Sequence, residues 1–182
     1  MQAGQVFFEG EDISRIPVTE RVRKGLAISP EGRRLFKDLS VEDNLRVGGV
    51  IHPTSFYAKD RERVLTLFPR LGERLNSLAG NLSGGEQQML AIGRALMTRP
   101  KLIMIDELSL GLMPKVIDQC YQALKLLRSE GMTVLLVEQN TERALATADD
   151  VCVLESGATV WRGSAVDARN DPTLAAAYLG LH

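Results

Sequence analysis

Residues 82–88 of this chain read LSGGEQQ. Serine is a common N-cap residue, and the apolar spacing that follows predicts a helix from Ser83 through Met97. Gly84 and Gly85 expose the backbone N–H groups of the first turn, because they carry no side chains. Since free N–H groups and the helix dipole both favour negative charge, this start is suited to a phosphate. A capped surface helix with a flexible entry is the alternative.

A second informative string, LIMIDE, occupies residues 102–107. Its apolar part lies between Pro100 and an acidic pair, which predicts a buried strand. Acids at the carboxyl end of a parallel strand stand at the edge where open α/β sheets bind ligands. One carboxylate can hold Mg²⁺ and its neighbour can polarise an attacking water. For such a pair alone, two solvated acids in a strand-to-helix turn remain the alternative.

Short apolar runs alternate with helical patterns elsewhere in the chain. Such alternation predicts an α/β fold whose parallel sheet has helices on both faces. We expect strands at 6–8, 26–28, 102–105, 133–137 and 151–154, the last one forming an antiparallel hairpin with 159–161. We expect helices at 17–22, 41–47, 59–67, 83–97, 116–128 and 140–148, with a last helix starting at Asp171. Residues 40–79 are expected to form a helical subdomain inserted into this α/β layer, with Ser40 as a helix cap.

Length and composition exclude several classes of protein. The 182 residues correspond to about one domain at roughly 150 residues per domain. With 22 basic and 23 acidic residues the net charge is -1, which argues against binding nucleic acid through bulk charge. Cys120 and Cys152 lack metal-ligand spacing, which argues against a disulfide scaffold or zinc module. No apolar run approaches the ~18 residues of a membrane span, and no signal peptide is evident, so we expect a reduced, cytoplasmic-type protein.

Together the two strings resemble the signature motif and the Walker B strand of ATP-binding subunits of ABC transporters. The resemblance runs over essentially the whole chain and implies the P-loop nucleotidase (ABC ATPase) fold, with ATP and Mg²⁺ as cofactors. It also implies a head-to-tail dimer with a second ABC ATPase subunit. The resemblance assigns roles to nine residues: Asp106 holds magnesium, Glu107 polarises water, Gln139 senses the γ-phosphate, Glu31 lies in the loop that links nucleotide to the membrane subunit, and Ser83, Gly84, Gly85, Glu86 and Gln87 form the nucleotide-binding signature.

Sequence variants narrow the resemblance to one subfamily. Pro30-Glu31-Gly32-Arg33-Arg34, Ser109 to Leu112, Val137 to Asn140 and Tyr178-Leu179-Gly180 are similar to ATPase subunits of branched-chain (hydrophobic) amino acid importers. The nearest competitor is the ATPase subunit of a urea or amide importer. The resemblance implies that ATP hydrolysis drives amino acid uptake at the cytoplasmic face of the cell membrane. It implies membrane permeases as partners, a binding protein as an indirect partner, and no nucleic acid.

One family motif is absent from the sequence. Relatives carry a phosphate loop, G-x-x-x-x-G-K-[ST], before the strand that resembles residues 6–8. The nearest frame here, Gly80 to Gly85, is followed by Glu86 and Gln87. We therefore expect residues 1–182 to form a single ABC ATPase domain that is truncated at its N-terminus and binds and hydrolyses ATP poorly alone. Whether it is an enzyme on its own stays open, and a partial subunit or fragment that supplies only the signature half-site is the alternative.

Overall fold

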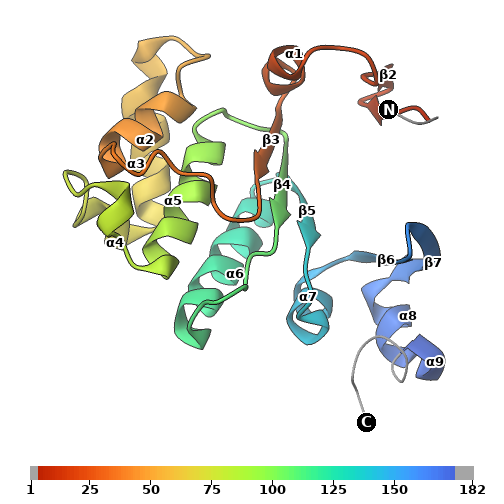
Figure 1. Ribbon diagram of the computed structural model, residues 1–182. Coiled ribbons are helices and arrows are strands. Elements are labelled where there is room, and N and C mark those ends of the chain that lie inside the picture. The colour runs from red at the N-terminus through yellow and green to blue at the C-terminus, as the bar shows by residue number, and fades with distance from the viewer. Residues whose placement is uncertain (1–3, 175–182) are drawn as a thin grey trace. The chain divides into compact units, whose positions relative to one another are not determined.

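The computed structural model describes residues 4–174 of the chain. They belong to two compact units, with 4–135 in the first and 136–174 in the second, and each unit is described by itself. Figure 1 shows the chain from red to blue, with helices α1 to α6 preceding β5 along the chain and α7 to α9 following it.

A three-stranded sheet carries the candidate residue Asp106 at the end of its middle strand. Its strand order is β3 (Leu26–Ser29), β4 (Leu102–Asp106) and β5 (Thr133–Val137), and all three confirm strands expected from the sequence. Strands β3 and β4 are parallel, with Ala27 opposite Ile103 and Ser29 opposite Ile105. Parallel neighbours need a crossover connection, and here that connection is formed by residues 30–101.

The two faces of the sheet are covered unequally. Because side chains alternate along a strand, Ala27, Ile103 and Ile105 share one face, and all three are buried. Helix α5 contacts both of these strands. Ile28 points to the opposite face and is 56% exposed, and Asp106 belongs to that same face. In β3 the second face is thus more exposed at Ile28 than the first face is at Ala27, although Leu26 on this second face is buried.

Helix α5 is the central helix of the first unit. It spans Gly84–Leu96, confirming the predicted helix, and nine of its side chains or glycines are buried, from Gly85 to Leu96. Helix α6 (Pro114–Ser129) crosses it so closely that a Cβ atom on Gly85 would lie 2.6 Å from Cγ1 of Val116. The second glycine of the LSGGEQQ stretch therefore serves helix packing, whatever else it does.

The segment expected to be helical contains α2 (Val41–Gly48), η1 (Thr54–Phe56), α3 (Tyr57–Leu67), α4 (Pro69–Gly72) and η2 (Ala79–Asn81). Ser40 caps α2 as predicted, because its side chain accepts a hydrogen bond from the Asp43 N–H at 3.0 Å. Val64 and Phe68 are each 1% exposed and form the apolar face of this segment. The close approach of Val64 to Gly93 packs the segment against α5.

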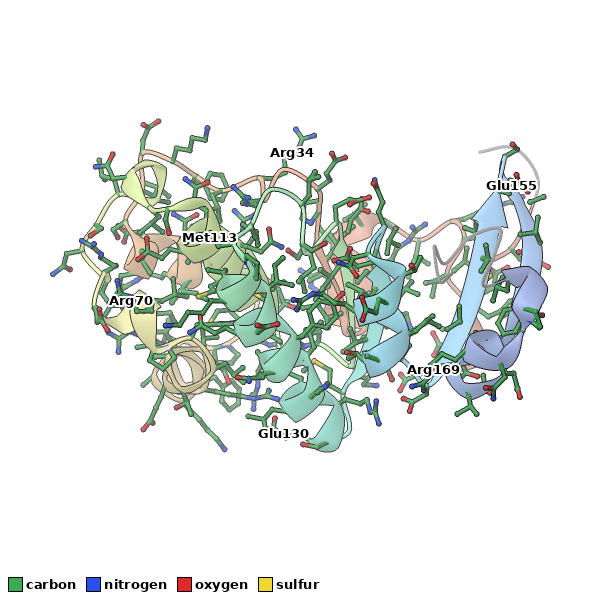
Figure 2. All side chains as sticks on the ribbon, turned by 90° about the horizontal axis from the view of Figure 1, so that it is seen from below. Arg34, Arg70, Met113, Glu130, Glu155 and Arg169 are labelled. Atoms are coloured by element: carbon green, nitrogen blue, oxygen red, sulfur yellow. The ribbon has the colours of Figure 1, made fainter. Side chains whose placement is uncertain are left out.

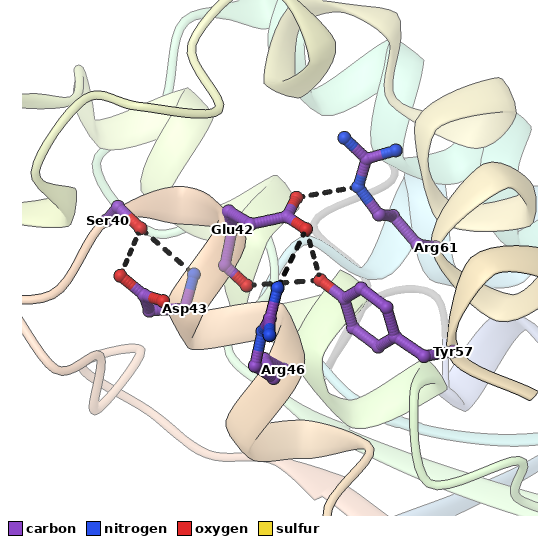
Figure 3. Close-up of polar contacts among 6 residues, drawn as sticks. All are labelled: Ser40, Glu42, Asp43, Arg46, Tyr57 and Arg61. Atoms are coloured by element: carbon purple, nitrogen blue, oxygen red, sulfur yellow. Dashed lines mark hydrogen bonds and ion pairs between the residues drawn. The ribbon is translucent and has the colours of Figure 1, made fainter. Parts of the chain in front are cut away.

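A polar cluster ties α2 to α3 (Figure 3). The Glu42 carboxylate accepts hydrogen bonds from the Tyr57 hydroxyl at 2.8 Å and from Nε of Arg61 at 2.6 Å. Arg46 lies over the Tyr57 ring, 5.2 Å from its centre. Burial, followed by the hydrogen bond to Glu42 and its charge, raises the pKa of Tyr57 to about 12.

The N-terminal strand makes a hairpin that the sequence interpretation missed. Strand β1 (Phe7–Phe8) pairs antiparallel with β2 (Glu11–Asp12), which is not among the strands expected from the sequence. Glu9 and Gly10 both have positive φ, 50° and 82°, as a tight type I′ turn requires. Helix α1 (Val18–Arg23) then starts after Pro17, in agreement with the predicted helix.

The second unit contains α7 (Thr141–Thr147), β6 (Asp150–Glu155), β7 (Ala158–Ser164), α8 (Ala165–Asn170) and α9 (Pro172–Leu174). The predicted hairpin is confirmed, since β6 and β7 are antiparallel. Placing the strand at 151–154 in the parallel sheet was wrong, because β6 and β7 form a sheet of their own. The short helix α8 was not predicted. Within residues 4–174 no helix has the length and apolar character that a membrane crossing needs.

Candidate functional site

A reciprocal cap fixes the start of α5. The Ser83 side chain accepts a hydrogen bond from the Glu86 N–H at 3.3 Å, and the Glu86 carboxylate accepts one from the Ser83 N–H at 2.9 Å. This capping box uses the third N–H of the helix. Within the described residues the N–H groups of Gly84 and Gly85 keep no such intrachain acceptor, so they are the donors available to an anion.

Two arginines add to this cap. Arg70 and Arg74 of the α4 region lie 3.8 Å and 3.9 Å from Oε1 of Glu86. Burial opposes ionisation of Glu86, but its contacts with Ser83 and the two positive charges outweigh burial and lower the pKa of Glu86. The carboxylate of Glu86 is therefore committed to holding the turn that begins α5.

Arg33 lies flat against the same turn. A Cβ atom on Gly84 would be 3.5 Å from both terminal nitrogens of Arg33 and 3.7 Å from Cδ2 of Leu112. Nη1 of Arg33 donates to Oε1 of Gln87 at 3.4 Å, and Nε donates to Oε1 of Gln88 at 3.3 Å. The Gln87 side chain, which was predicted to contact nucleotide, therefore accepts a hydrogen bond from within its own chain.

The loop after β3 carries Glu31, which is exposed. Gly32, Arg33 and Arg34 follow with φ of 70°, 63° and 47°, so three consecutive residues are left-handed. That conformation costs roughly 1–2 kcal/mol for each residue with a Cβ. The side chain of Arg34 points away from the ribbon (Figure 2).

Asn44 holds the next part of this loop, and the sequence analysis did not single it out. It is fully buried, its Oδ1 accepts from the Phe36 N–H at 3.1 Å, and its Nδ2 lies 2.9–3.3 Å from the carbonyl oxygens of Phe36, Leu39 and Ser40. One side-chain amide therefore accepts from one backbone N–H and shares its two N–H donors among three carbonyl oxygens. The only sequence signal for this role is that Asn44 is a polar residue on the otherwise apolar, buried side of α2.

The end of β4 places the two acids that the sequence singled out. Asp106 is the last strand residue and is half-buried, while Glu107 follows with φ of 53° and is also half-buried. Leu108 is fully buried and anchors the turn. Mg²⁺ is bound in nucleotide sites by one or two carboxylates together with phosphate oxygens, so a single half-buried Asp106 fits this group. Among residues 4–174, no cluster of three His, Cys, Asp or Glu ligands accompanies it.

The structure brings several of the predicted residues together within the first unit. Leu112 and Val116, which follow the acids of β4, pack against Gly84 and Gly85. Glu31 and Asp106 leave neighbouring parallel strands at the same edge of the sheet. Gln139 belongs to the second unit, where it is exposed and its N–H donates to Oε2 of Glu138 at 3.1 Å.

Comparison with curated proteins gives matches over nearly all of this chain and about three quarters of each relative. The chain is 48% identical over 178 residues to the high-affinity branched-chain amino acid transport ATP-binding protein BraG of Pseudomonas aeruginosa, covering 98% of this chain and 76% of BraG. It is 36% identical to the probable branched-chain amino acid transport ATP-binding protein LivF of Archaeoglobus fulgidus, covering 91% of this chain and 70% of LivF.

Comparison with solved structures supports the same fold. The crystal structure of the ADP conformation of an ATP-binding cassette of an ABC transporter matches with a TM-score of 0.83 at 25% identity, covering 98% of this chain and 78% of that one. A second ABC transporter ATP-binding subunit matches with a TM-score of 0.81 at 26% identity, covering 98% and 74%. Residues 1–109 also match the model of the ABC transporter family. The chain is therefore a member of the ABC transporter ATP-binding family, with its α/β fold of the P-loop nucleotidase type.

Proposed function

We propose that this chain is the ATP-binding subunit of a branched-chain amino acid importer, in which ATP binding and hydrolysis drive uptake. The similarity to BraG over 98% of the chain supports this assignment. In this proposal the subunit lies on the cytoplasmic face of the membrane, with a second ABC ATPase subunit, membrane permeases and, indirectly, a binding protein as partners.

The observation that carries the proposal is the capped glycine start of α5. The Ser83–Glu86 box fixes the turn, and the N–H groups of Gly84 and Gly85 stay available for an anion. We infer that Ser83, Gly84 and Gly85 contact the γ-phosphate of ATP held by the second subunit in a head-to-tail dimer. Glu86 and Gln87 serve that contact by keeping the turn in shape, because their side chains are bonded within the chain.

The remaining predicted residues take roles by their position in the fold. Asp106 would hold Mg²⁺ through its carboxylate; the ion, when bound, neutralises phosphate charge. Glu107 would orient and deprotonate the attacking water. Glu31 would pass changes at the nucleotide to the membrane subunit. Gln139 would donate a hydrogen bond to the γ-phosphate, since its amide is neutral at every pH.

A mixed-subunit assay tests the half-site directly. A second ABC ATPase subunit keeps its own phosphate loop but carries Arg in place of its signature Ser, so its own signature is blocked. We expect this chain to restore ATP hydrolysis to that mixture, and we expect its Ser83→Arg variant not to do so. Ser129→Arg, at an exposed position at the end of α6, is the matched control and should restore hydrolysis as the unchanged chain does.

The half-site assignment is wrong if the unchanged chain melts cooperatively and still gives no gain in hydrolysis. The transported class is tested separately, by uptake of labelled leucine and of labelled urea in cells whose transport depends on this chain. Leucine uptake supports the proposal, and urea uptake without leucine uptake would assign the chain to the competing importer class.

A further inference from the structure

We propose that Arg33 and Arg94 form a two-point clamp that fixes residues 30–36 to α5, with Arg33 as the positioning residue for the first turn of that helix. This inference rests on the proposed function of the α5 start. It deepens that function by naming what links the start of α5 to the loop that carries Glu31.

The first point of the clamp is the side chain of Arg33. It donates to the side-chain oxygens of Gln87 and Gln88, and its guanidinium lies against Gly84. No ion pair joins Arg33 to a carboxylate among the residues that the structure describes. The hydrogen bonds of the Arg33 side chain are therefore made to the first turn of α5 and not to a neighbouring acid.

Gln87 extends this contact to the residue before the cap. Its Nε2 donates to the carbonyl oxygens of Ala79 at 3.3 Å and of Leu82 at 3.1 Å, while its Oε1 accepts from Arg33. Leu82 directly precedes Ser83, and Gly84 directly follows it. Arg33 thus bears on the chain on both sides of Ser83.

The second point of the clamp is Arg94, which reaches back from the last turn of α5. Its Nη2 donates to the carbonyl oxygens of Arg33 at 3.3 Å and of Arg34 at 2.8 Å. Its guanidinium also lies over the ring of Phe36, 5.3 Å from the centre. One arginine therefore reaches from loop to helix, and the other reaches from helix to loop.

The clamp stabilises the left-handed backbone at 32–34. A run of such residues persists only where surrounding contacts hold it, and here the side chains of Arg33 and Arg94 add to the backbone hydrogen bonds from Arg33 to Pro30 and from Arg34 to Gly32. Because both ends are held, the loop with Glu31 and the turn with Ser83 shift together. A displacement of either one is then felt by the other without any contact between Glu31 and Ser83.

Hydrogen exchange on the 182-residue chain tests the clamp without nucleotide or partner. In Arg33→Ala we expect the hydrogen-bonded amides within 31–39, and those of Ser83 and 86–88, to exchange about tenfold faster, while those of β4 stay unchanged. Arg34→Ala is the matched control. It removes the same charge from a residue that is also left-handed, but the Arg34 side chain points outward. It should leave both segments at the rates of the unchanged chain.

Arg33→Lys guards against simple misfolding, since it keeps the charge and the aliphatic stem but cannot donate from the planar fork. Faster exchange in both segments of Arg33→Lys supports the clamp. Faster exchange in one segment only, or an equal effect of Arg34→Ala, overturns it.

The mixed-subunit assay supplies a functional readout. We expect Arg33→Ala to lower kcat about tenfold with KM for ATP within twofold, and Arg34→Ala to stay within twofold in both. An unchanged kcat in Arg33→Ala would overturn the positioning role. If the unchanged chain gives no activity, the proposed function fails, while the exchange experiment still decides whether the clamp exists.

Discussion

The side-chain amide of Asn44 binds both backbone polar groups of Phe36, accepting from its N–H and donating to its carbonyl oxygen. This pairing fixes the chain between the loop of residues 30–36 and the cap of α2. It also explains how a polar residue can be fully buried in a helix face that otherwise packs against α5.

Replacing Asn44 should therefore destabilise the fold in a way that depends on the replacement. Asn44→Ala leaves four partly buried backbone groups with fewer partners and should cost about 1–3 kcal/mol. Asn44→Asp should cost more at pH 7, because its second carboxylate oxygen would face three carbonyl oxygens. Urea unfolding at pH 7 and at pH 4.5 checks both, and the excess cost of Asn44→Asp should shrink at the lower pH as its carboxyl group is protonated.

Gly85 and Gly84 should differ sharply in their tolerance of a methyl group. In Gly85→Ala the new Cβ would lie 2.6 Å from Cγ1 and 2.9 Å from Cγ2 of Val116. Because χ1 of valine is restricted in a helix, the Val116 side chain cannot rotate away easily. We expect a loss of about 1–3 kcal/mol in the free energy of unfolding. Gly84→Ala makes only ordinary contacts at 3.5 Å and should stay within about 1 kcal/mol of the unchanged chain. Equal urea midpoints for the two variants would contradict the packing of α5 on α6.

The two cysteines should react at very different rates. Burial raises the pKa of Cys120 to about 12, and its side chain is 0% exposed, so little thiolate forms there at pH 8. Cys152 is exposed on β6. Ellman's reagent should label Cys152 promptly in the native chain and Cys120 only after unfolding in guanidinium. Native labelling should vanish in Cys152→Ser, and rapid labelling that survives this substitution would contradict the burial of Cys120.

Tyr57 should make stability fall at high pH. Its pKa is about 12 in the folded chain and about 10 when unfolded, so the neutral phenol is favoured by folding. This contribution is fully present below pH 10 and is lost as the pH rises through 12. We expect the stability of the unchanged chain relative to Tyr57→Phe to decrease between pH 10 and pH 12, as followed by urea unfolding. A constant difference over that range would mean that Tyr57 titrates normally.

Local patterns in the sequence predicted the elements that depend on neighbouring residues. The caps at Ser40 and Ser83 and the apolar runs of β3, β4 and β5 are of this kind, and so are α5 and α6. Strand β2 was missed because Glu9, a residue with a Cβ, adopts the left-handed conformation that its turn needs. Helix α8 was missed although Ser164 and Asp167 give it a recognisable cap, because it is only six residues long.

Contacts between distant parts of the chain could not be predicted from local sequence patterns. The hairpin of β6 with β7 was predicted, but placing β6 in the parallel sheet was wrong, because which sheet a strand joins depends on the choice of partner and not on the strand's own pattern. Arg33 and Arg94 are 61 residues apart, and nothing local to either position indicates that their side chains hold each other's segment. In the candidate site, the residue types were predicted from motifs, whereas the contacts that hold them in place came from the structure.

The crossover between β3 and β4 also sets an order of folding. The strands are hydrogen-bonded neighbours, yet residues 30–101 lie between them, so their pairing closes a long loop at a large entropic cost. Residues 41–96 can instead collapse through nearer contacts, such as those of α2 and α3 with α5. Folding should therefore begin with the helical segment, and the sheet should form late. Substitutions at Leu45 should slow folding, whereas substitutions at Ala27 should mainly speed unfolding.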